Sequence, residues 1–107
     1  MPGVSVLPFG TVRAGLPQSV LVRMEPCAVI PGHVHEVDAE MYPVSGSACL
    51  IADDSNFSGR LVCVGNQVKF AARRLHGFVA GPEGFSFVSV NGGIVDAEPG
   101  RWDITFV

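Results

Sequence analysis

The chain has 107 residues, of which 48% are hydrophobic and only 16% charged, and its formal net charge is −3. The hydrophobic fraction excludes a disordered chain, and no apolar run reaches the roughly 18 residues of a membrane-spanning helix. Because the net charge is negative and the longest basic stretch is Arg73-Arg74, we expect neither a nucleic-acid partner nor a membrane partner.

Turn-forming residues interrupt the chain throughout. Its 13 glycines and 8 prolines are about a fifth of the residues, against roughly 12% on average, and they leave no room for a helix of ordinary length. Many short β-branched runs separated by turns predict an all-β sandwich or barrel. In chain order, the expected strands are Val4–Leu7, Val20–Met24, Cys27–Ile30, Glu40–Val44, Ala48–Ala52, Leu61–Val64, Val68–Phe70, His76–Ala80, Phe85–Val90, Ile94-Val95 and Trp102–Val107.

The connections between these strands contain two further signals. Pro31-Gly32 and Gly81–Gly84 are typical of turns. Glu36–Met41 and Ala71–Leu75 are each long enough for one helical turn, but neither has a sustained apolar stripe. We therefore expect strands and turns to account for the whole chain.

Length and cysteine content predict the organisation and the compartment. A chain of this size predicts one domain over residues 1–107. Cys27, Cys49 and Cys63 are an odd number without a CxxC pair, and their apolar neighbours predict buried, reduced thiols. Since the first residues also lack the regions of a signal peptide, we expect a cytoplasmic protein. So little charge also predicts self-association, with a homodimer as the simplest form.

Two of the three histidines form the sequence His33-Val34-His35. Residues i and i+2 of an extended segment point to the same side, so the two imidazoles converge. The acidic residues Glu36, Asp38 and Glu40 follow at once, and the turn signal Pro31-Gly32 precedes the pair, which predicts a position at a strand edge. Imidazoles with a carboxylate suit one divalent transition metal such as Fe, Mn, Ni, Co, Cu or Zn. The alternative is a pair of histidines in a solvated loop.

The third histidine, His76, would on its own be read as a hydrogen-bonded core residue. Together with the pair, however, it makes the sequence resemble the cupin superfamily. The first cupin motif, G-x5-H-x-H-x3-4-E-x6-G, is matched by His33, His35, Glu40 and Gly46. In the second motif, G-x5-P-x-G-x2-H-x3-N, Gly65 precedes His76 at the required distance.

The resemblance implies a single-domain, cupin-type double-stranded β-helix, or jelly-roll barrel, with a metal in its mouth. Carried over residue by residue, the metal ligands would be His33, His35, Glu40 and His76. Glu36 is the alternative carboxylate, although it directly follows His35 and would point away in an extended strand.

Several positions depart from the motifs. Cys27 stands at the opening glycine of the first motif, and the spacing from Glu40 to Gly46 is one residue short. In the second motif, the places of proline, glycine and asparagine are taken by Ala71, Arg73 and Ala80. None of these departures removes a ligand residue type.

Such a site predicts a metal-dependent enzyme that acts on a small molecule. Three imidazoles and one carboxylate leave about two positions of an octahedral metal for a substrate or dioxygen. We favour dioxygenase-type chemistry, and a non-redox isomerase, epimerase or lyase acting on a sugar or carbonyl acid is the alternative. A non-catalytic protein that senses a metal or small molecule is a further alternative, because a shared fold does not determine a shared function.

Other side chains are candidates for the chemistry around the metal. Tyr42 lies two residues after Glu40, so we expect it on the same inward face, where its phenol could orient or protonate a substrate; a core aromatic is the alternative. Arg73 could meet an anionic substrate at the rim, or belong to a solvated turn. The candidates for the substrate-binding wall are Phe78, Phe85 and Phe87.

Overall fold

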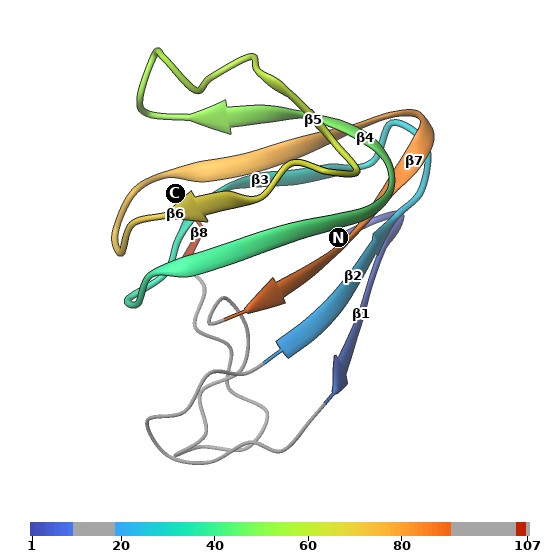
Figure 1. Ribbon diagram of the computed structural model, residues 1–107, viewed down its shortest axis with the longest axis horizontal. Helices are drawn as coiled ribbons and strands as arrows, with labels where there is room; N and C mark the ends of the chain where they lie inside the picture. Colours follow the sequence, from blue (N-terminus) through green and yellow to red (C-terminus); the bar gives the residue numbers. More distant parts are fainter. Residues whose placement is uncertain (10–18, 91–104, 107) are drawn as a thin grey trace.

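The computed structural model describes residues 1–9, 19–90 and 105–106 of the chain (Figure 1). Eight strands account for its regular structure, and the described residues contain no helix, so the all-β prediction is confirmed. There is accordingly no helix in this part of the chain that is long and apolar enough to cross a membrane. The strands are β1 (Val4–Phe9), β2 (Ser19–Met24), β3 (Val29–Val34), β4 (Ala39–Ala52), β5 (Leu61–Cys63), β6 (Val68–Phe70), β7 (His76–Val90) and β8 (Thr105–Phe106).

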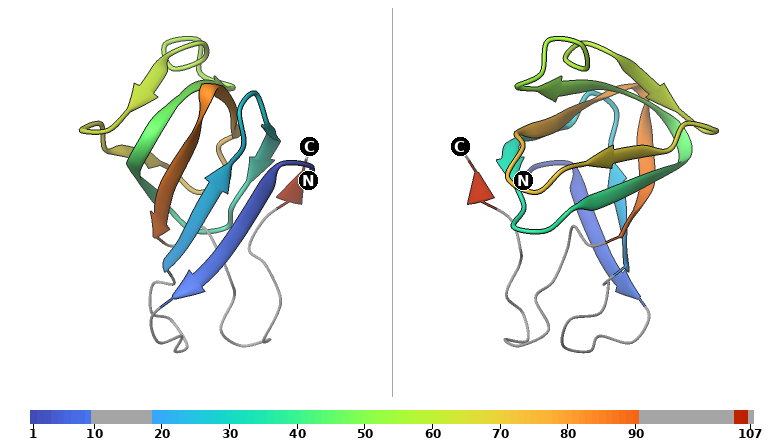
Figure 2. Two further views of the ribbon diagram at one scale, coloured as in Figure 1. Left: turned by 90° about the vertical axis from the view of Figure 1, so that its right-hand side faces the viewer. Right: turned by 60° about the vertical axis from the view of Figure 1, so that its left-hand side comes forward.

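All strand pairs are antiparallel, and strands β7 and β4 connect the sheet. The hydrogen-bonded order is β1-β2-β7-β3-β8, while β4 pairs with β5, β6 and β7. The first part of β4 pairs with the last part of β7, and the last part of β4 with the first part of β7. The pairing has register shifts between Pro43 and Ser45 and between Gly46 and Ala48, where the two long strands bend, and the sheet curls around an interior (Figure 2).

The two long strands bend where the sequence predicts chain-reversing turns. The sequence predicts separate strands on either side of Gly46 and of Gly81–Gly84, but the structure continues β4 and β7 through both places. Gly46 and Gly84 have positive φ angles of 72° and 83°, and a Cβ on Gly46 would lie 2.1 Å from the Gly84 carbonyl oxygen. Glycine at these positions allows two strands to bend together at close range, without reversing the chain.

The structure also differs from the sequence predictions at the expected helical turns and at two cysteines. Residues 36–41 and 71–75 form bends, turns and strand ends instead of helical turns. Cys27 and Cys63 are exposed, so their expected burial is wrong, and all three cysteines are free thiols. The expected strand Ile94-Val95 and most of Trp102–Val107 lie outside the described residues.

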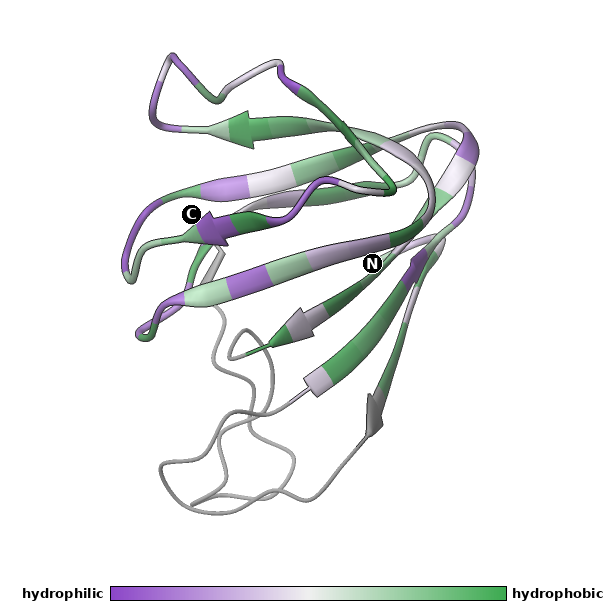
Figure 3. Cartoon of the chain, viewed as in Figure 1, coloured by the Kyte–Doolittle hydropathy of each residue, from purple (hydrophilic) through white to green (hydrophobic). Residues whose placement is uncertain are grey.

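The interior is filled by alternate residues of β2, β4 and β7, as expected for strands with one inward face. Hydrophilic residues gather in the connections between strands, whereas β2 is largely hydrophobic (Figure 3). The buried core consists of Val20, Val22, Met24, Ile30, Met41, Ala48, Leu50, Val62, Phe78, Ala80, Phe85 and Phe87.

Candidate metal centre

A β-bulge in strand β3 brings the first histidine of the site to the interior. Ile30 pairs with Phe78 and His33 pairs with His76, so β3 uses three steps where β7 uses two. The extra residue lies at Pro31-Gly32, which is a bulge within the strand and not the expected turn. Because strand side chains alternate between faces, an unbroken β3 with Ile30 inside would place His33 outside. The bulge resets this alternation.

The opposite strand is shaped to receive the bulge. A Cβ at Gly77 would lie 2.6 Å from the Ile30 carbonyl oxygen and 3.0 Å from the Pro31 carbonyl carbon. Any side chain at this position would therefore push β3 and β7 apart. Gly77 is adjacent to His76, so the close approach is made beside a residue of the site.

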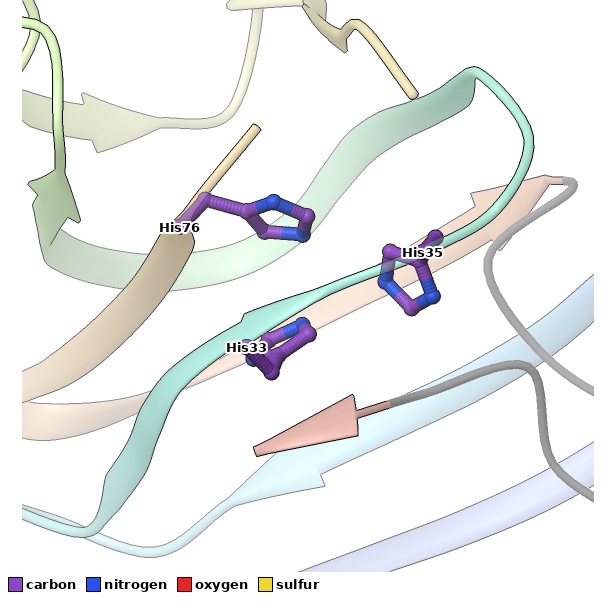
Figure 4. Close-up of side chains that lie close together, drawn as sticks. All are labelled: His33, His35 and His76. Carbon is purple, nitrogen blue, oxygen red and sulfur yellow. The ribbon is translucent and has the colours of Figure 1, made fainter. Parts of the chain in front are cut away.

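Three histidines converge on one point inside the barrel (Figure 4). One ring nitrogen each of His33, His35 and His76 lies within 4.8 Å of the others. The ring centroids are 4.9 Å apart for His33 and His35, 4.3 Å for His33 and His76, and 5.1 Å for His35 and His76. The three residues are 3%, 5% and 3% exposed. The structure thus assembles a compact cluster of buried nitrogen donors.

Backbone carbonyls orient two of these rings. The Nδ1 atom of His33 lies 2.8 Å from the Pro31 carbonyl oxygen, and that of His76 lies 3.2 Å from the Arg74 carbonyl oxygen. A neutral imidazole that donates its proton from Nδ1 carries its lone pair on Nε2. Metal-binding histidines commonly use this arrangement. Phe70 also stacks on His76, with centroids 4.0 Å apart and planes 9° apart.

Burial keeps two of the histidines in the form that binds metals. It lowers the pKa of His33 to about 4 and that of His76 to about 3, with further lowering from the neighbouring imidazoles. Both rings are therefore neutral at pH 7. These two imidazoles are therefore in the protonation state that metal binding requires.

The structure does not bring Glu40 into this cluster. Glu40 lies between the inward residues Ala39 and Met41, which are 3% and 1% exposed, and its carboxylate turns to the outer face. There Oε2 accepts a 2.5 Å hydrogen bond from the Tyr42 hydroxyl, and Oε1 lies 3.5 Å from the Lys69 ammonium. These contacts, chiefly the hydrogen bond from Tyr42, lower the pKa of the Glu40 carboxyl. Its role as a metal ligand stays a prediction.

The one-residue departure in spacing explains this orientation. Counting the motif spacing back from Gly46 leads to Ala39 and not to Glu40. Because strand side chains alternate with a period of two, a shift of one residue moves a side chain to the opposite face. Ala39 consequently occupies the inward position.

Two other candidates also lie outside the interior. Tyr42 shares the face of Glu40 as expected, but that face is the outer one, so its expected inward position is wrong. The Arg73 side chain is 77% exposed and forms an ion pair with Glu36 at 3.2 Å. The Arg73 backbone N–H instead donates a 2.7 Å hydrogen bond to the His35 carbonyl oxygen. This backbone contact, rather than the guanidinium, connects Arg73 to the site.

A mostly apolar cavity of about 150 Å³ adjoins the three histidines. Phe78 and Phe87 are part of its wall as expected, whereas Phe85 packs behind them, with its ring centroid 5.3 Å from that of Phe87. Besides the histidines, the lining residues are Met1, Val4, Val6, Val20, Val22, Ile30, Ala39, Glu40, Met41, Phe70, Phe78, Phe87 and Ser89.

Met41 and Phe70 are among the wall residues that sequence reasoning missed. Alternation along β4 would have placed Met41 opposite Glu40, so a signal for it existed. No sequence signal indicated Phe70, because its stacking on His76 arises from the pairing of β6 with β4.

No protein-family model and no curated protein matches the sequence. Solved structures do match. An RmlC-like cupin from Shewanella frigidimarina is 18% identical with a TM-score of 0.71, over 82% of this chain and 74% of that chain. KdgF from Halomonas sp. is 20% identical with a TM-score of 0.69, over 84% and 78%.

Oxalate decarboxylase from Bacillus subtilis is also similar, at 27% identity and a TM-score of 0.62. The match covers 70% of this chain but only 20% of the decarboxylase chain. Likeness at these identities establishes the fold, and the chain has the cupin fold.

Proposed function

We propose that this cupin-fold chain binds one divalent transition metal through His33, His35 and His76 and acts on a small molecule in the adjoining cavity. The observation that supports this most strongly is the convergence of three buried imidazoles whose ring nitrogens lie within 4.8 Å of one another. Imidazole nitrogens are common ligands of divalent transition metals, and these three rings present theirs to one point.

The donor chemistry fits such an ion but does not select one. Neutral imidazole suits Fe, Mn, Ni, Co, Cu and Zn. A structure of the oxalate decarboxylase from Bacillus subtilis is described for its Mn(II) centres, which supports a metal in a barrel of this kind. When bound, such a metal supplies Lewis-acid chemistry or, with a redox-active ion, chemistry with dioxygen.

Within this proposal, dioxygenase-type chemistry is the favoured reaction class. Isomerases, epimerases and lyases need a positioned general acid or base beside the substrate. Tyr42, the candidate for that role, lies on the outer face, and the cavity wall is mainly aliphatic and aromatic. The chain's own contribution would be to bind the substrate, orient it and exclude water. Non-redox chemistry and non-catalytic metal or small-molecule sensing stay as the alternatives.

Metal analysis combined with oxygen consumption tests this proposal. The protein is purified without chelators or histidine affinity tags, its metal content is measured, and oxygen uptake is followed with a panel of diketones, phenols and thiols. Iron with substrate-linked oxygen uptake supports the dioxygenase. Zinc or nickel without uptake favours the non-redox alternative, and a protein that stays metal-free when offered divalent metals contradicts the site.

We also propose that the chain forms a homodimer in the cytoplasm. The support for the homodimer is an apolar row on the outer face. It consists of consecutive register partners across β1, β2, β7 and β4, namely Leu7, Leu21, Val88 and Tyr42. Leu7 is 62% and Tyr42 38% exposed. A second copy would cover this row. Light scattering coupled to size exclusion tests it, with Leu7→Lys expected to yield a monomer.

A further inference from the structure

The cluster of donors supplies no negative charge to a metal. Its members, His33, His35 and His76, are neutral ligands, and no carboxylate of the described residues completes the group. Strand β4 presents Ala39 and Met41 to the interior, and both are almost fully buried. A divalent cation on these three rings would therefore keep both of its positive charges.

The one carboxylate residue in the described wall is already neutralised elsewhere. The Glu40 side chain accepts a hydrogen bond from Tyr42 and forms an ion pair with Lys69 on the outer face. Turning it inward would break both contacts and leave the Lys69 ammonium without this partner. Both contacts favour the outward position of the Glu40 side chain.

The surroundings do not compensate the charge of an ion. Apart from Glu40, the described side chains that line the cavity with the three histidines are apolar, except for the hydroxyl of Ser89. An uncompensated charge in such an apolar enclosure is costly, and the cost falls when an opposite charge binds beside it. A bound anion would supply this negative charge.

We propose that the substrate of this site is a small organic anion, a carboxylate or enolate, whose oxygen atoms supply the negative charge that strand β4 does not. This inference rests on the proposed metal-binding function and adds the substrate class. A cavity of about 150 Å³ has the size that holds a benzene-sized molecule, so a small anion fits beside the three histidines. Arg73, the guanidinium expected to meet an anion, is not part of the wall, so recognition depends on the metal.

A binding titration on the cobalt form tests the proposal without an activity assay. The protein is loaded with Co(II), and its visible absorption is followed while acetate or the nearly isosteric neutral acetamide is added. We expect acetate to bind at least about 10-fold more tightly than acetamide. If Co(II) does not bind, the proposed function fails. If Co(II) binds and the two ligands have equal affinity, this inference alone fails.

Variants of β4 locate the cause of the preference. Ala39→Glu should place a carboxylate inside, raise Co(II) affinity and reduce the acetate-to-acetamide ratio several-fold. Ala39→Gln, which has nearly the same volume without the charge, should keep the wild-type ratio. Equal ratios in these two variants would contradict the charge argument.

Glu40→Gln keeps the test valid where a larger residue at Ala39 prevents folding. The Glu40 carboxylate lies on the outer face. Glu40→Gln should therefore have the Co(II) affinity and the acetate-to-acetamide affinity ratio of the wild type. Weaker Co(II) binding together with a higher ratio would show that Glu40 turns inward as a ligand, and the proposal would be overturned.

Discussion

His33 and His76 are register partners on strands β3 and β7, and their ring centroids lie 4.3 Å apart, although they belong to different sequence motifs. They meet because the Pro31-Gly32 bulge turns His33 inward and Gly77 lets the bulge approach. His35 joins them from the position just after β3. The candidate metal centre thus depends on an irregular strand and on the close packing of its neighbour.

Removing one donor should abolish metal retention. In His76→Ala two imidazoles remain, and we expect Co(II) affinity to fall by roughly 100-fold or more. Mutating a residue that only hydrogen-bonds to a metal ligand already lowers metal affinity by about 10- to 100-fold, and removing a ligand should cost at least as much. Metal stoichiometry after gel filtration measures this, and circular dichroism checks that the barrel folds. Phe78→Leu is the control, because it alters the same cavity without removing a ligand. Wild-type metal stoichiometry in His76→Ala would remove His76 from the ligand set.

The metal-free protein should lose stability as the pH falls. Burial lowers the pKa of His33 to about 4 and of His76 to about 3 in the folded state, so the unfolded chain binds more protons below the ordinary value of about 6.5. Stability should therefore rise with pH between about 3 and 6.5. A shift of this size amounts to roughly 3 kcal/mol for His33 alone, before coupling between the rings is considered.

Urea unfolding of the chelator-treated protein at several pH values measures this dependence. His76→Asn is the control, because it removes one titrating ring and should flatten the curve. A free energy of unfolding that does not change between pH 6.5 and pH 4 would contradict the burial of these rings.

A methyl group opposite the bulge should disturb the site. In Gly77→Ala the added Cβ would meet the Ile30 carbonyl oxygen at 2.6 Å, so β3 has to shift away from β7. We expect a loss of about 1–3 kcal/mol, typical of overpacking, together with weaker Co(II) binding. Equilibrium unfolding and Co(II) titration measure the two effects.

Gly59→Ala separates the two effects. Gly59 has a φ angle of +83° and open space around it, so alanine there strains the backbone far from the histidines. It should lower stability while leaving Co(II) affinity unchanged. If both glycine variants reduce Co(II) affinity equally, the bulge has no special role.

The backbone of Arg73, and not its side chain, should matter for the site. Arg73 has a φ angle of +63°, which favours glycine, and its N–H donates to the His35 carbonyl oxygen. Arg73→Gly keeps the N–H and should leave stability equal or raise it by up to about 1 kcal/mol, because the exposed ion pair with Glu36 contributes little. Arg73→Pro removes the N–H and cannot adopt this φ, so it should lower both stability and Co(II) affinity.

Thermal unfolding and Co(II) titration compare these two variants. Weaker acetate binding to the Co(II) form of Arg73→Gly would indicate that the guanidinium does contact the anion, as the sequence suggested. Equal Co(II) affinity in Arg73→Gly and Arg73→Pro would show that the hydrogen bond to His35 has no effect.

The amino-acid sequence by itself determined the all-β class, the places of most strands and the three histidines. Alternating hydrophobic residues and frequent glycines are local signals, and His33 and His35 share a face whenever their segment is extended. The motif spacing counted back from Gly46 leads to Ala39. The alternation of side chains along a strand then places Glu40 on the face opposite to Ala39 and Met41. These features depend on neighbours along the chain, which is why they can be read from it.

Only the tertiary structure decided which face each segment presents to the metal centre. Pro31-Gly32 has the composition of a turn, and it becomes a bulge because β7, with Gly77, pairs with both sides of it. Gly81–Gly84 likewise becomes a bend because Gly46 of β4 lies against Gly84. The stacking of Phe70 on His76 has the same origin. Each outcome depends on a strand that is distant in the sequence, so local composition identifies the irregular positions but not their geometry.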